Sequence, residues 1–319
     1  MQALVTGGAG FIGSHLVDAL LARGAKVRVI DDLSSGHPES VHPDAELVVG
    51  DIRDVPLVTR LMEGVDVVLH EAARNSIPRS LKDPKGAFEV NLVGTYNLLI
   101  AARDARVGRF VYASSSSIYG DNPVLPRQED LLPSPVSMYA GTKAAMEDLC
   151  AGFSAAFGLP SLGLRYFNVF GPRQDPANPY AAVVPLWVRA ALRGEAATIF
   201  GDGSQTRDFT FVENVVRANM MAVDADATRL KGAVNIATGG IITVLELHRA
   251  IADAVGAYVP PRHVPPRPGD QPFSQADLDR ARALLGFAPS VSFQEGIRRT
   301  VAWYRAGGAD AWDPSAAGT

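Results

Sequence analysis

A tyrosine and a lysine that could move protons lie four positions apart, at Tyr139 and Lys143. On a helix this spacing places both side chains on one face, about one turn apart. A tyrosine with a pKa of about 10 is a poor base at neutral pH. A neighbouring ammonium group favours the phenolate and lowers that pKa. The same spacing is common on solvated helix surfaces, so the pair gains meaning only beside other motifs.

Four consecutive serines, Ser114–Ser117, follow the apolar run Phe110–Ala113, which predicts a short buried strand. Parallel sheets of the doubly wound type bind their ligands at the carboxyl ends of the strands. We therefore predict that Ser115 hydrogen-bonds the reacting hydroxyl group of a substrate. The alternative is a polar loop without a chemical role.

Three glycines spaced G-x-x-G-x-x-G occur within the segment Thr6–Gly13, between the predicted strand Ala3–Thr6 and the predicted helix Phe11–Arg23. Glycines in this context allow a tight turn and a close approach of the backbone to a pyrophosphate, which then faces the helix N-terminus. We predict cofactor contacts at Gly7, Gly10, Phe11, Ile12 and Gly13. An ordinary glycine-rich turn is the alternative.

An acidic residue, Asp31, lies 18 residues beyond Gly13, at the end of the predicted strand Lys26–Ile30. A carboxylate at this position accepts hydrogen bonds from the adenosine ribose and would repel a 2′-phosphate. Because Asp32, rather than an arginine, comes next, we predict NAD and not NADP. Asp51 and Ile52 follow the strand Glu46–Val49 and could meet the adenine, although a strand-end turn explains Asp51 almost as well.

Strands and helices alternate through the first two-thirds of the chain, which predicts parallel strands joined by right-handed crossovers. Further strands are predicted at Val65–Leu69 and Ser161–Arg165, and long helices at Pro84–Arg106 and Met138–Phe157. After about Gly171 proline and glycine become dense, and short helices are predicted at Val183–Arg193, Val244–Val255, Gln275–Leu285 and Phe293–Tyr304. The fold class is therefore α/β, a doubly wound parallel (Rossmann) sheet with a smaller, interleaved C-terminal substrate-binding lobe. We expect residues 1–170 to bind the cofactor, with part of 205–237 joining them, and 171–319 to form the smaller lobe. Residues 197–236 should contain two short strands and a helix.

Composition excludes several classes of protein. The chain has 319 residues, 47% of them hydrophobic, with a net charge of −4. It lacks the basic face of a nucleic-acid-binding protein, and no apolar run approaches the ~20 residues that span a bilayer. The first residues do not resemble a signal peptide, and the six histidines do not form a metal-binding cluster with Cys or Asp. Cys150 is the only cysteine, so an internal disulfide is impossible, which fits a cytoplasmic protein.

The sequence resembles the extended short-chain dehydrogenase/reductase family and, within it, the UDP-hexose 4-epimerases. The matching stretches span nearly the whole chain: TGGAGFIGSHL (6–16), GDIRD (50–54), VLHEAA (68–73), NLVGT (91–95), FVYASSSSIYGD (110–121), MYAGTK (138–143), LRYFNVFGPRQDP (164–176), IFGDGSQTRDF (199–209) and D-x-x-x-A-x-x-x-LGF (277–287).

The resemblance implies a mechanism in which Tyr139, assisted by Ser115, removes the proton of the sugar 4-hydroxyl while the C4 hydride passes to NAD⁺. The 4-keto sugar then turns over and receives the hydride on its opposite face. Lys143 would also hold the nicotinamide ribose. Since the cofactor ends unchanged, we expect it to stay bound between turnovers.

The resemblance also assigns binding residues. Further cofactor contacts are implied at Ser35, Gly36, Ala72, Ala73, Asn91, Ser114 and Phe167. Contacts to a UDP-sugar are implied at Ser76, Ser116, Asn168, Ala182, Val183, Trp187, Phe200, Arg207, Arg267, Asp270 and Ser274. Trp187 is explained equally well as a core aromatic, and the two arginines are of the type that clamps a diphosphate.

Alternative functions remain open. Dehydratases and decarboxylases of this family carry a glutamate in the serine stretch, whereas Ser114–Ile118 contains no acid. UDP-glucuronate 4-epimerases tend to have Thr in place of Asn168 and Arg in place of Asp175, and Asp175 would repel a uronate if it faced the sugar. A uronate 4-epimerase, or another nucleotide-sugar enzyme on this scaffold, is the second hypothesis. A non-catalytic NAD-binding regulatory protein is the third.

Specificity and assembly follow from the same resemblance. A small residue at Ser274, where relatives have a bulky Tyr, leaves room for an N-acetyl group, whereas Asn75 departs from the expected Lys or Gly. We expect activity on UDP-Glc/UDP-Gal, on UDP-GlcNAc/UDP-GalNAc, or on both. Relatives dimerise through two long helices, here Pro84–Arg106 and Met138–Phe157. We therefore expect a homodimer, although apolar residues of both helices could be core contacts (Phe88, Leu92, Tyr96, Leu99, Met146, Leu149 and Phe153).

Overall fold

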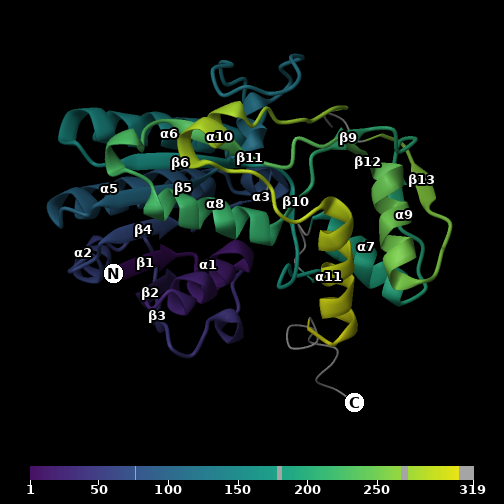
Figure 1. Ribbon diagram of the computed structural model, residues 1–319, viewed down its shortest axis with the longest axis horizontal. Helices are drawn as coiled ribbons and strands as arrows, with labels where there is room; N and C mark the ends of the chain where they lie inside the picture. The colour runs from purple at the N-terminus through teal and green to yellow at the C-terminus, as the bar shows by residue number, and fades with distance from the viewer. Residues whose placement is uncertain (76, 178–181, 267–271, 309–319) are drawn as a thin grey trace.

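A parallel sheet forms the centre of the computed structural model, which describes residues 1–75, 77–177, 182–266 and 272–308 (Figure 1). Seven described strands form it, in the order β11-β6-β5-β4-β1-β2-β3. Their bounds are β1 (Gln2–Thr6), β2 (Lys26–Asp31), β3 (Glu46–Val49), β4 (Val67–His70), β5 (Arg109–Ser115), β6 (Ser161–Tyr166) and β11 (Ala233–Ile236). The order reverses between β1 and β4, which is where doubly wound sheets open a crevice for ligands. The predicted α/β class is confirmed.

Helices cover both faces of this sheet because each contributes one apolar stripe. On one face lie α1 (Phe11–Ala22), α8 (Val212–Asp224) and α10 (Asp279–Leu285), which bury Leu16 and Val215. On the other lie α2 (Val55–Leu61), α5 (Thr95–Asp104) and α6 (Met138–Phe157), which bury Leu98 and Met146. Strands with helices on both sides are shielded from solvent along their whole length, as the fully buried β4 and β6 are.

Several boundaries agree with the prediction. The helix Met138–Phe157 and the strand Glu46–Val49 have the predicted bounds. Helix α1 ends close to Gly24, whose φ of 74° is the left-handed conformation that a helix end favours.

Other predicted boundaries are wrong. The helix predicted at Pro84–Arg106 is divided into α4 (Pro84–Phe88), a π-helical turn (Glu89–Gly94) and α5. A π turn inserts one residue into a helix, and a period of 3.6 does not reveal it. Strand β5 extends two residues further than predicted and includes Ser114 and Ser115. Helix α10 starts at Asp279 and not at Gln275, since the backbone of Gln275 and Asp277 hydrogen-bonds to Arg127.

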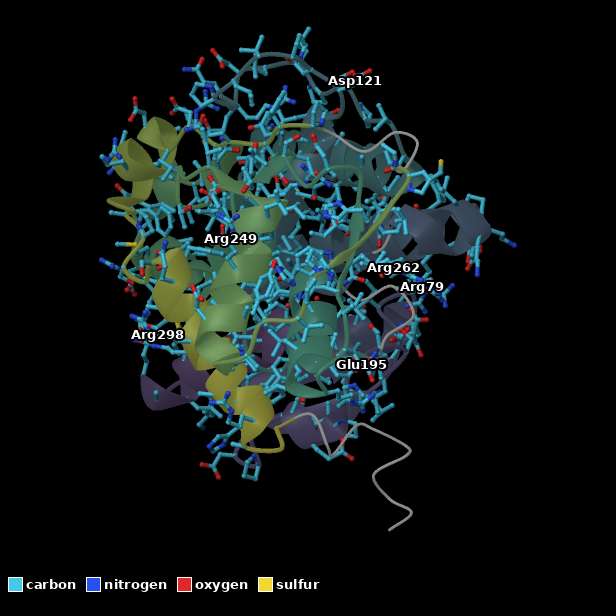
Figure 2. The ribbon with its side chains drawn as sticks, turned by 90° about the vertical axis from the view of Figure 1, so that its right-hand side faces the viewer. Arg79, Asp121, Glu195, Arg249, Arg262 and Arg298 are labelled. Carbon is cyan, nitrogen blue, oxygen red and sulfur yellow. The ribbon has the colours of Figure 1, made fainter. Side chains whose placement is uncertain are left out.

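The other elements form a second lobe, on the right of Figure 1. Its helices are α7 (Val183–Leu192), α9 (Val244–Val255) and α11 (Phe293–Arg305), packed around the rings of Phe170, Phe209, Phe211 and Phe293. Figure 2 turns this lobe toward the viewer, with Arg249 on α9 and Arg298 on α11. The short strands are β7 (Val169–Phe170), β8 (Thr198–Phe200), β9 (Thr206–Arg207), β10 (Thr210–Phe211), β12 (Ile242–Thr243) and β13 (Arg262–Val264).

Residues 197–236 contain four strands rather than the predicted two, because a two-residue strand is too short to show an alternating pattern. Its last strand, β11, pairs with β6 and so returns the chain to the large sheet.

The remaining elements are short connectors: α3 (Ile77–Lys82) and the 3₁₀ turns Pro38–Ser40, Ser116–Tyr119 and Ala227–Arg229. In the described part of the chain, none of the helices has the length and apolar character needed to cross a membrane. Cys150 is a free, buried thiol.

Candidate active site

Three adjoining cavities lie at the carboxyl ends of the sheet strands and under the second lobe. The glycine-loop cavity is lined by the loop after β1 and the ends of β2 and β4. The serine cavity contains the end of β5 and the start of α6. The α7 cavity lies between α7 and β8 and has a volume of about 560 Å³. Phe11 and Ile12 line both of the first two cavities, and Asn168 and Arg207 line both of the last two. The serine cavity therefore connects the other two.

The glycine loop leaves no room for side chains. Gly7 has a φ of 70°, and a Cβ atom there would lie 2.7 Å from the amide nitrogen of Ala72. Helix α1 begins after Gly10, where no side chain caps it, so the N–H groups of its first turn remain available to a ligand. A pyrophosphate fits a bare helix N-terminus of this kind. All five predicted loop contacts, Gly7, Gly10, Phe11, Ile12 and Gly13, line the glycine-loop cavity.

The acidic residues of this cavity are anchored by backbone amides. The carboxylate of Asp31 accepts hydrogen bonds from the N–H groups of Ala9 and Leu33, each at 2.9 Å, while burial raises its pKa. Asp32 accepts one from Ser34 at 2.9 Å. Both carboxylates line the cavity, as Ser35 does.

Gly36 is the exception among these neighbours and is not part of the lining. It packs against Ala9, whose carbonyl carbon would lie 2.8 Å from a Cβ on Gly36. Its role is therefore to bring the loop after β2 close to the glycine loop.

Asp51 and Ile52 also line the glycine-loop cavity. Asp51 forms an ion pair with Arg53 at 2.6 Å, and hydrogen bonds from Arg53 lower its pKa. It therefore carries a negative charge at the wall of the cavity.

The loop after β4 supplies Ala72 and Ala73 to the lining. Asn91, predicted to contact the cofactor, does not line it. Its side chain accepts the N–H of Arg74 at 2.7 Å and donates to Thr142 at 2.9 Å. A buried amide with these partners fixes the loop against α6.

The Tyr139 and Lys143 side chains lie in the serine cavity with Ser115. Burial raises the pKa of Tyr139, a hydrogen bond with Ser115 lowers it, and the charge of Glu71 raises it. The Lys143 ammonium is buried and donates to the carbonyl of Ala113 at 2.6 Å. A base and its cationic neighbour are thus close to a hydroxyl donor, which is the arrangement needed to move a proton to and from a substrate hydroxyl.

The other serines differ in orientation. The Ser114 hydroxyl donates its hydrogen bond to Glu147, so this hydrogen is not available to a ligand. The Ser117 hydroxyl donates to Ser115 at 2.9 Å, and Ser116 lines the cavity. Phe167 is fully buried and also contributes to the lining.

The predicted substrate residues that the structure describes lie on the serine and α7 cavities: Asn168, Ala182, Val183, Trp187, Phe200, Arg207 and Ser274. Asn168, whose φ is 34°, donates to the carbonyl of Asp208 at 3.1 Å. Trp187 belongs to the lobe core and also lines the α7 cavity. Ser76, Arg267 and Asp270 lie outside the described residues.

Asp175 does not line the serine cavity; its carboxylate lies 3.4 Å from His37. The prediction that it would repel a uronate depended on its facing the sugar, so that argument is lost.

Two polar residues that line the site, Glu71 and Arg127, and one that supports it, Asp208, were not identified from the sequence. Glu71 lines both the glycine-loop and serine cavities. Arg127 is 5% exposed and lines the serine cavity, and its Nη1 has no hydrogen-bond partner in the part of the chain that is described. Asp208 is fully buried and accepts hydrogen bonds from Thr238 and Gly239. Glu71 could have been found by the strand-end rule applied to Asp31, since it follows the strand predicted at Val65–Leu69.

Residues 3–237 match the family model described as the NAD dependent epimerase/dehydratase family. The chain belongs to this family. The prediction of NAD as cofactor and the resemblance to the extended dehydrogenase/reductase family are thereby confirmed.

Individual members of the family resemble the chain over almost its full length. A UDP-glucose 4-epimerase of Mycolicibacterium smegmatis is 44% identical over 96% of this chain and 99% of its own. The solved UDP-glucose 4-epimerase of Thermotoga maritima, with UDP-glucose, is 38% identical with a TM-score of 0.93, covering 96% and 99% of the two chains. The UDP-N-acetylglucosamine 4-epimerase of Methanobrevibacter ruminantium, in complex with UDP-N-acetylmuramic acid, is 37% identical with a TM-score of 0.92, covering 96% and 98%.

Proposed function

We propose that this protein is a UDP-hexose 4-epimerase that inverts the sugar C4 through a transient 4-keto intermediate. The observation that carries the proposal is the grouping of Tyr139, Ser115 and Lys143 in the serine cavity, where the glycine-loop and α7 cavities adjoin it. The similarity to the M. smegmatis and T. maritima UDP-glucose 4-epimerases supports the same reaction.

The glycine-loop cavity is proposed to hold NAD. The first turn of α1 would face the pyrophosphate, Asp31 and Asp32 the adenosine ribose, and Asp51 with Ile52 the adenine. When bound, NAD supplies the acceptor and later the donor of the C4 hydride. We assign cofactor binding to residues 1–170 with part of 205–237, and substrate binding mainly to 171–319.

Tyr139 is proposed to remove the proton of the 4-hydroxyl in the first half of the reaction and to return it in the second. Ser115 hydrogen-bonds the same hydroxyl and stabilises the phenolate. Lys143 supplies the positive charge that favours this phenolate. Because the proton and the hydride both return to the sugar, the protein needs no net acid or base.

The UDP group is proposed to bind in the α7 cavity, with Asn168 and Arg207 at its junction with the serine cavity. Binding energy from the nucleotide holds the substrate while the hexose turns over. Ser274 leaves space beside the sugar, so we include N-acetylated hexoses among the substrates.

A second candidate, 4-epimerisation of UDP-glucuronate, is favoured by two observations. Arg127 places a buried guanidinium on the serine cavity, and a buried cation is strongly stabilised by a carboxylate partner. Asp175 is turned toward His37 and offers no repulsion.

Anomeric-proton NMR of the purified protein, with UDP-Glc, UDP-GlcNAc and UDP-GlcA in separate tubes and no added cofactor, tests both candidates. New signals of the galacto sugar identify the substrate and show that NAD is retained. Tyr139→Phe should keep its NAD and lose at least about 10²-fold in rate, whereas Tyr258→Phe, on an exposed residue, should match the wild type. If no tube changes even with added NAD, the epimerase proposal fails. Arg127→Gln should slow only the UDP-GlcA reaction if the second candidate is correct.

We further propose a cytoplasmic homodimer. Phe88 and Tyr96, from the first of the two segments expected at the interface, are 48% and 46% exposed, and Phe157, at the end of α6, is 53% exposed. Tyr96 and Phe157 both contact the ring of Phe153, so these two exposed rings lie near each other. Grouped exposed aromatic side chains are typical of a protein interface. Leu99, Met146 and Phe153 are buried within the subunit, so they are core contacts and not part of this face.

A further inference from the structure

Glu71 is a carboxylate at the junction of the glycine-loop and serine cavities. It is the first residue after β4, and its N–H donates to the carbonyl of Thr6 at 3.1 Å. It lines both cavities. Its position is therefore set by the centre of the sheet and not by a mobile loop.

A short chain of hydrogen bonds holds the Glu71 side chain from below. The Tyr166 hydroxyl donates to its carboxylate at 2.8 Å, and the Asn219 amide donates to that hydroxyl at 2.9 Å. Asn219 is fully buried on α8, on the opposite side of the sheet from α6. A carboxylate with a fixed donor on one oxygen keeps its remaining lone pairs directed into the cavities. Burial raises the pKa of Glu71 to about 7, although the Tyr166 hydrogen bond and the charge of Lys143 lower it, so Glu71 carries its negative charge above this pH.

The charged and titratable groups around Glu71 are few. Helix α6 contributes Lys143 and Tyr139, and β6 contributes Tyr166. His70, the preceding residue, has a pKa of about 3 because it is buried, so it is neutral.

Glu147 is the other carboxylate that acts on Lys143, but it is paired with Arg165 at 2.8 Å. Of these two carboxylates, Glu71 is the one that lines the serine cavity together with Lys143 and Tyr139, and Glu147 is the one whose charge is compensated by an arginine.

Lys143 needs such a charge. Its ammonium is buried, and the hydrogen bond that it donates goes to a neutral carbonyl. Burial lowers the pKa of Lys143 and favours the neutral amine, whereas the charge of Glu71 raises it. A neutral amine at this position would not stabilise the Tyr139 phenolate.

We propose that Glu71 is a positioning residue whose carboxylate keeps Lys143 in its ammonium form beside Tyr139. The inference rests on the proposed function, since it concerns the base of that reaction. The negative charge of Glu71 also disfavours the Tyr139 phenolate. Glu71 therefore sets the pH range in which the Tyr139 phenolate and the Lys143 ammonium are present together. Tyr166 and Asn219 hold this carboxylate in place.

The isosteric variant Glu71→Gln tests the proposal, because glutamine can still accept the Tyr166 hydrogen bond but carries no charge. Removal of the charge lowers the pKa of both Lys143 and Tyr139. In the pH profile of kcat/KM, the acidic limb reports the ionisation of Tyr139 and the alkaline limb that of Lys143. Both limbs should therefore move to lower pH, by about one unit. Glu71→Asp retains the charge and should restore the limbs toward those of the wild type even where kcat is reduced.

A second readout does not depend on turnover. Ultraviolet difference absorbance of the phenolate, with Tyr139→Phe subtracted, follows the titration of Tyr139 in the NAD-loaded protein. In Glu71→Gln this titration should move to lower pH, and in Tyr166→Phe, which retains the carboxylate, it should move less. Unchanged titration in Glu71→Gln overturns the proposal. A shifted titration in a protein that converts none of the UDP-sugars would sustain the role of Glu71 while refuting the epimerase function.

Discussion

Gly13 packs so tightly against Gly7 that a Cβ atom at Gly13 would lie 2.1 Å from the Gly7 carbonyl oxygen. The same oxygen accepts the N–H of Gly10 at 3.1 Å. The first turn of α1 is therefore seated directly on the loop that follows β1. The space that a ligand phosphate would occupy exists because hydrogen is the only side chain that fits there.

Gly13→Ala should disrupt the packing of α1 against the glycine loop. The methyl group meets backbone atoms that cannot move aside, so we expect a loss of about 1–3 kcal/mol in unfolding free energy and loss of retained NAD. The NAD released by denaturation of the purified variant can be quantified by absorbance. Gly152→Ala, in a helix where nothing lies within 4 Å of the added Cβ, is the matched control and should retain NAD fully. If Gly13→Ala retained as much NAD as the control, the assignment of this loop to the cofactor would be refuted.

Ser274→Tyr should narrow the sugar end of the serine cavity. Ser274 lines that cavity, and a bulky ring there removes space for a substituent at the sugar C2. We expect kcat/KM for the N-acetylated substrates to fall by at least about 10-fold relative to UDP-Glc. Phe273→Tyr changes the neighbouring residue, which lines the same cavity. This control should leave the ratio of kcat/KM between N-acetylated and plain substrates unchanged. An equal loss on plain and N-acetylated sugars would mean that this position does not select the C2 substituent.

His70 should make the fold sensitive to acid. Its ring nitrogens lie 2.7 Å from the Thr6 hydroxyl and 2.8 Å from the Thr95 hydroxyl, and burial lowers its pKa from 6.5 to about 3. Between these values the unfolded chain binds the proton and the folded chain does not. The stability present above pH 6.5 is therefore lost progressively as the pH falls toward 3.

From pH 7 to pH 5 this single histidine should cost about 2 kcal/mol of unfolding free energy. Urea denaturation at the two pH values measures the loss. His70→Gln retains hydrogen-bonding groups but does not titrate, so its loss should be smaller than that of the wild type by about this amount. Equal losses in the two proteins would show that His70 is already protonated in the fold.

Tyr96→Glu should separate the proposed dimer. Tyr96 is 46% exposed and contacts the ring of Phe153, so a carboxylate there would be buried without a partner in the assembled dimer. Light scattering after size exclusion should give a monomer mass at micromolar concentration. Tyr258→Glu, on a residue of the second lobe that is 63% exposed, should remain dimeric. A monomeric wild-type protein would refute the assembly.

The local features of this protein could be read from the sequence. The glycine loop, Asp31, and the spacing of Tyr139 and Lys143 each lie within one or two adjacent elements, and their geometry follows from a strand, a turn and a helix. Strand and helix periodicity likewise predicted the doubly wound sheet, because residues that face one way recur at 2 or 3.6 positions.

Tertiary contacts decided the rest. Tyr166 and Glu71 are 95 positions apart and meet at the carboxyl ends of β6 and β4, two strands of the same sheet that are separated by β5. Asp175 lies 3.4 Å from His37 and does not line the serine cavity, Asn91 hydrogen-bonds to Arg74 and Thr142, and Arg127 and Ser274 line the same cavity. A side chain's partner depends on which distant segments pack around it, and local periodicity carries no information about that packing. The sequence by itself determined which chemical groups this protein possesses; only the tertiary structure determined which of them face the ligand and which support the groups that do.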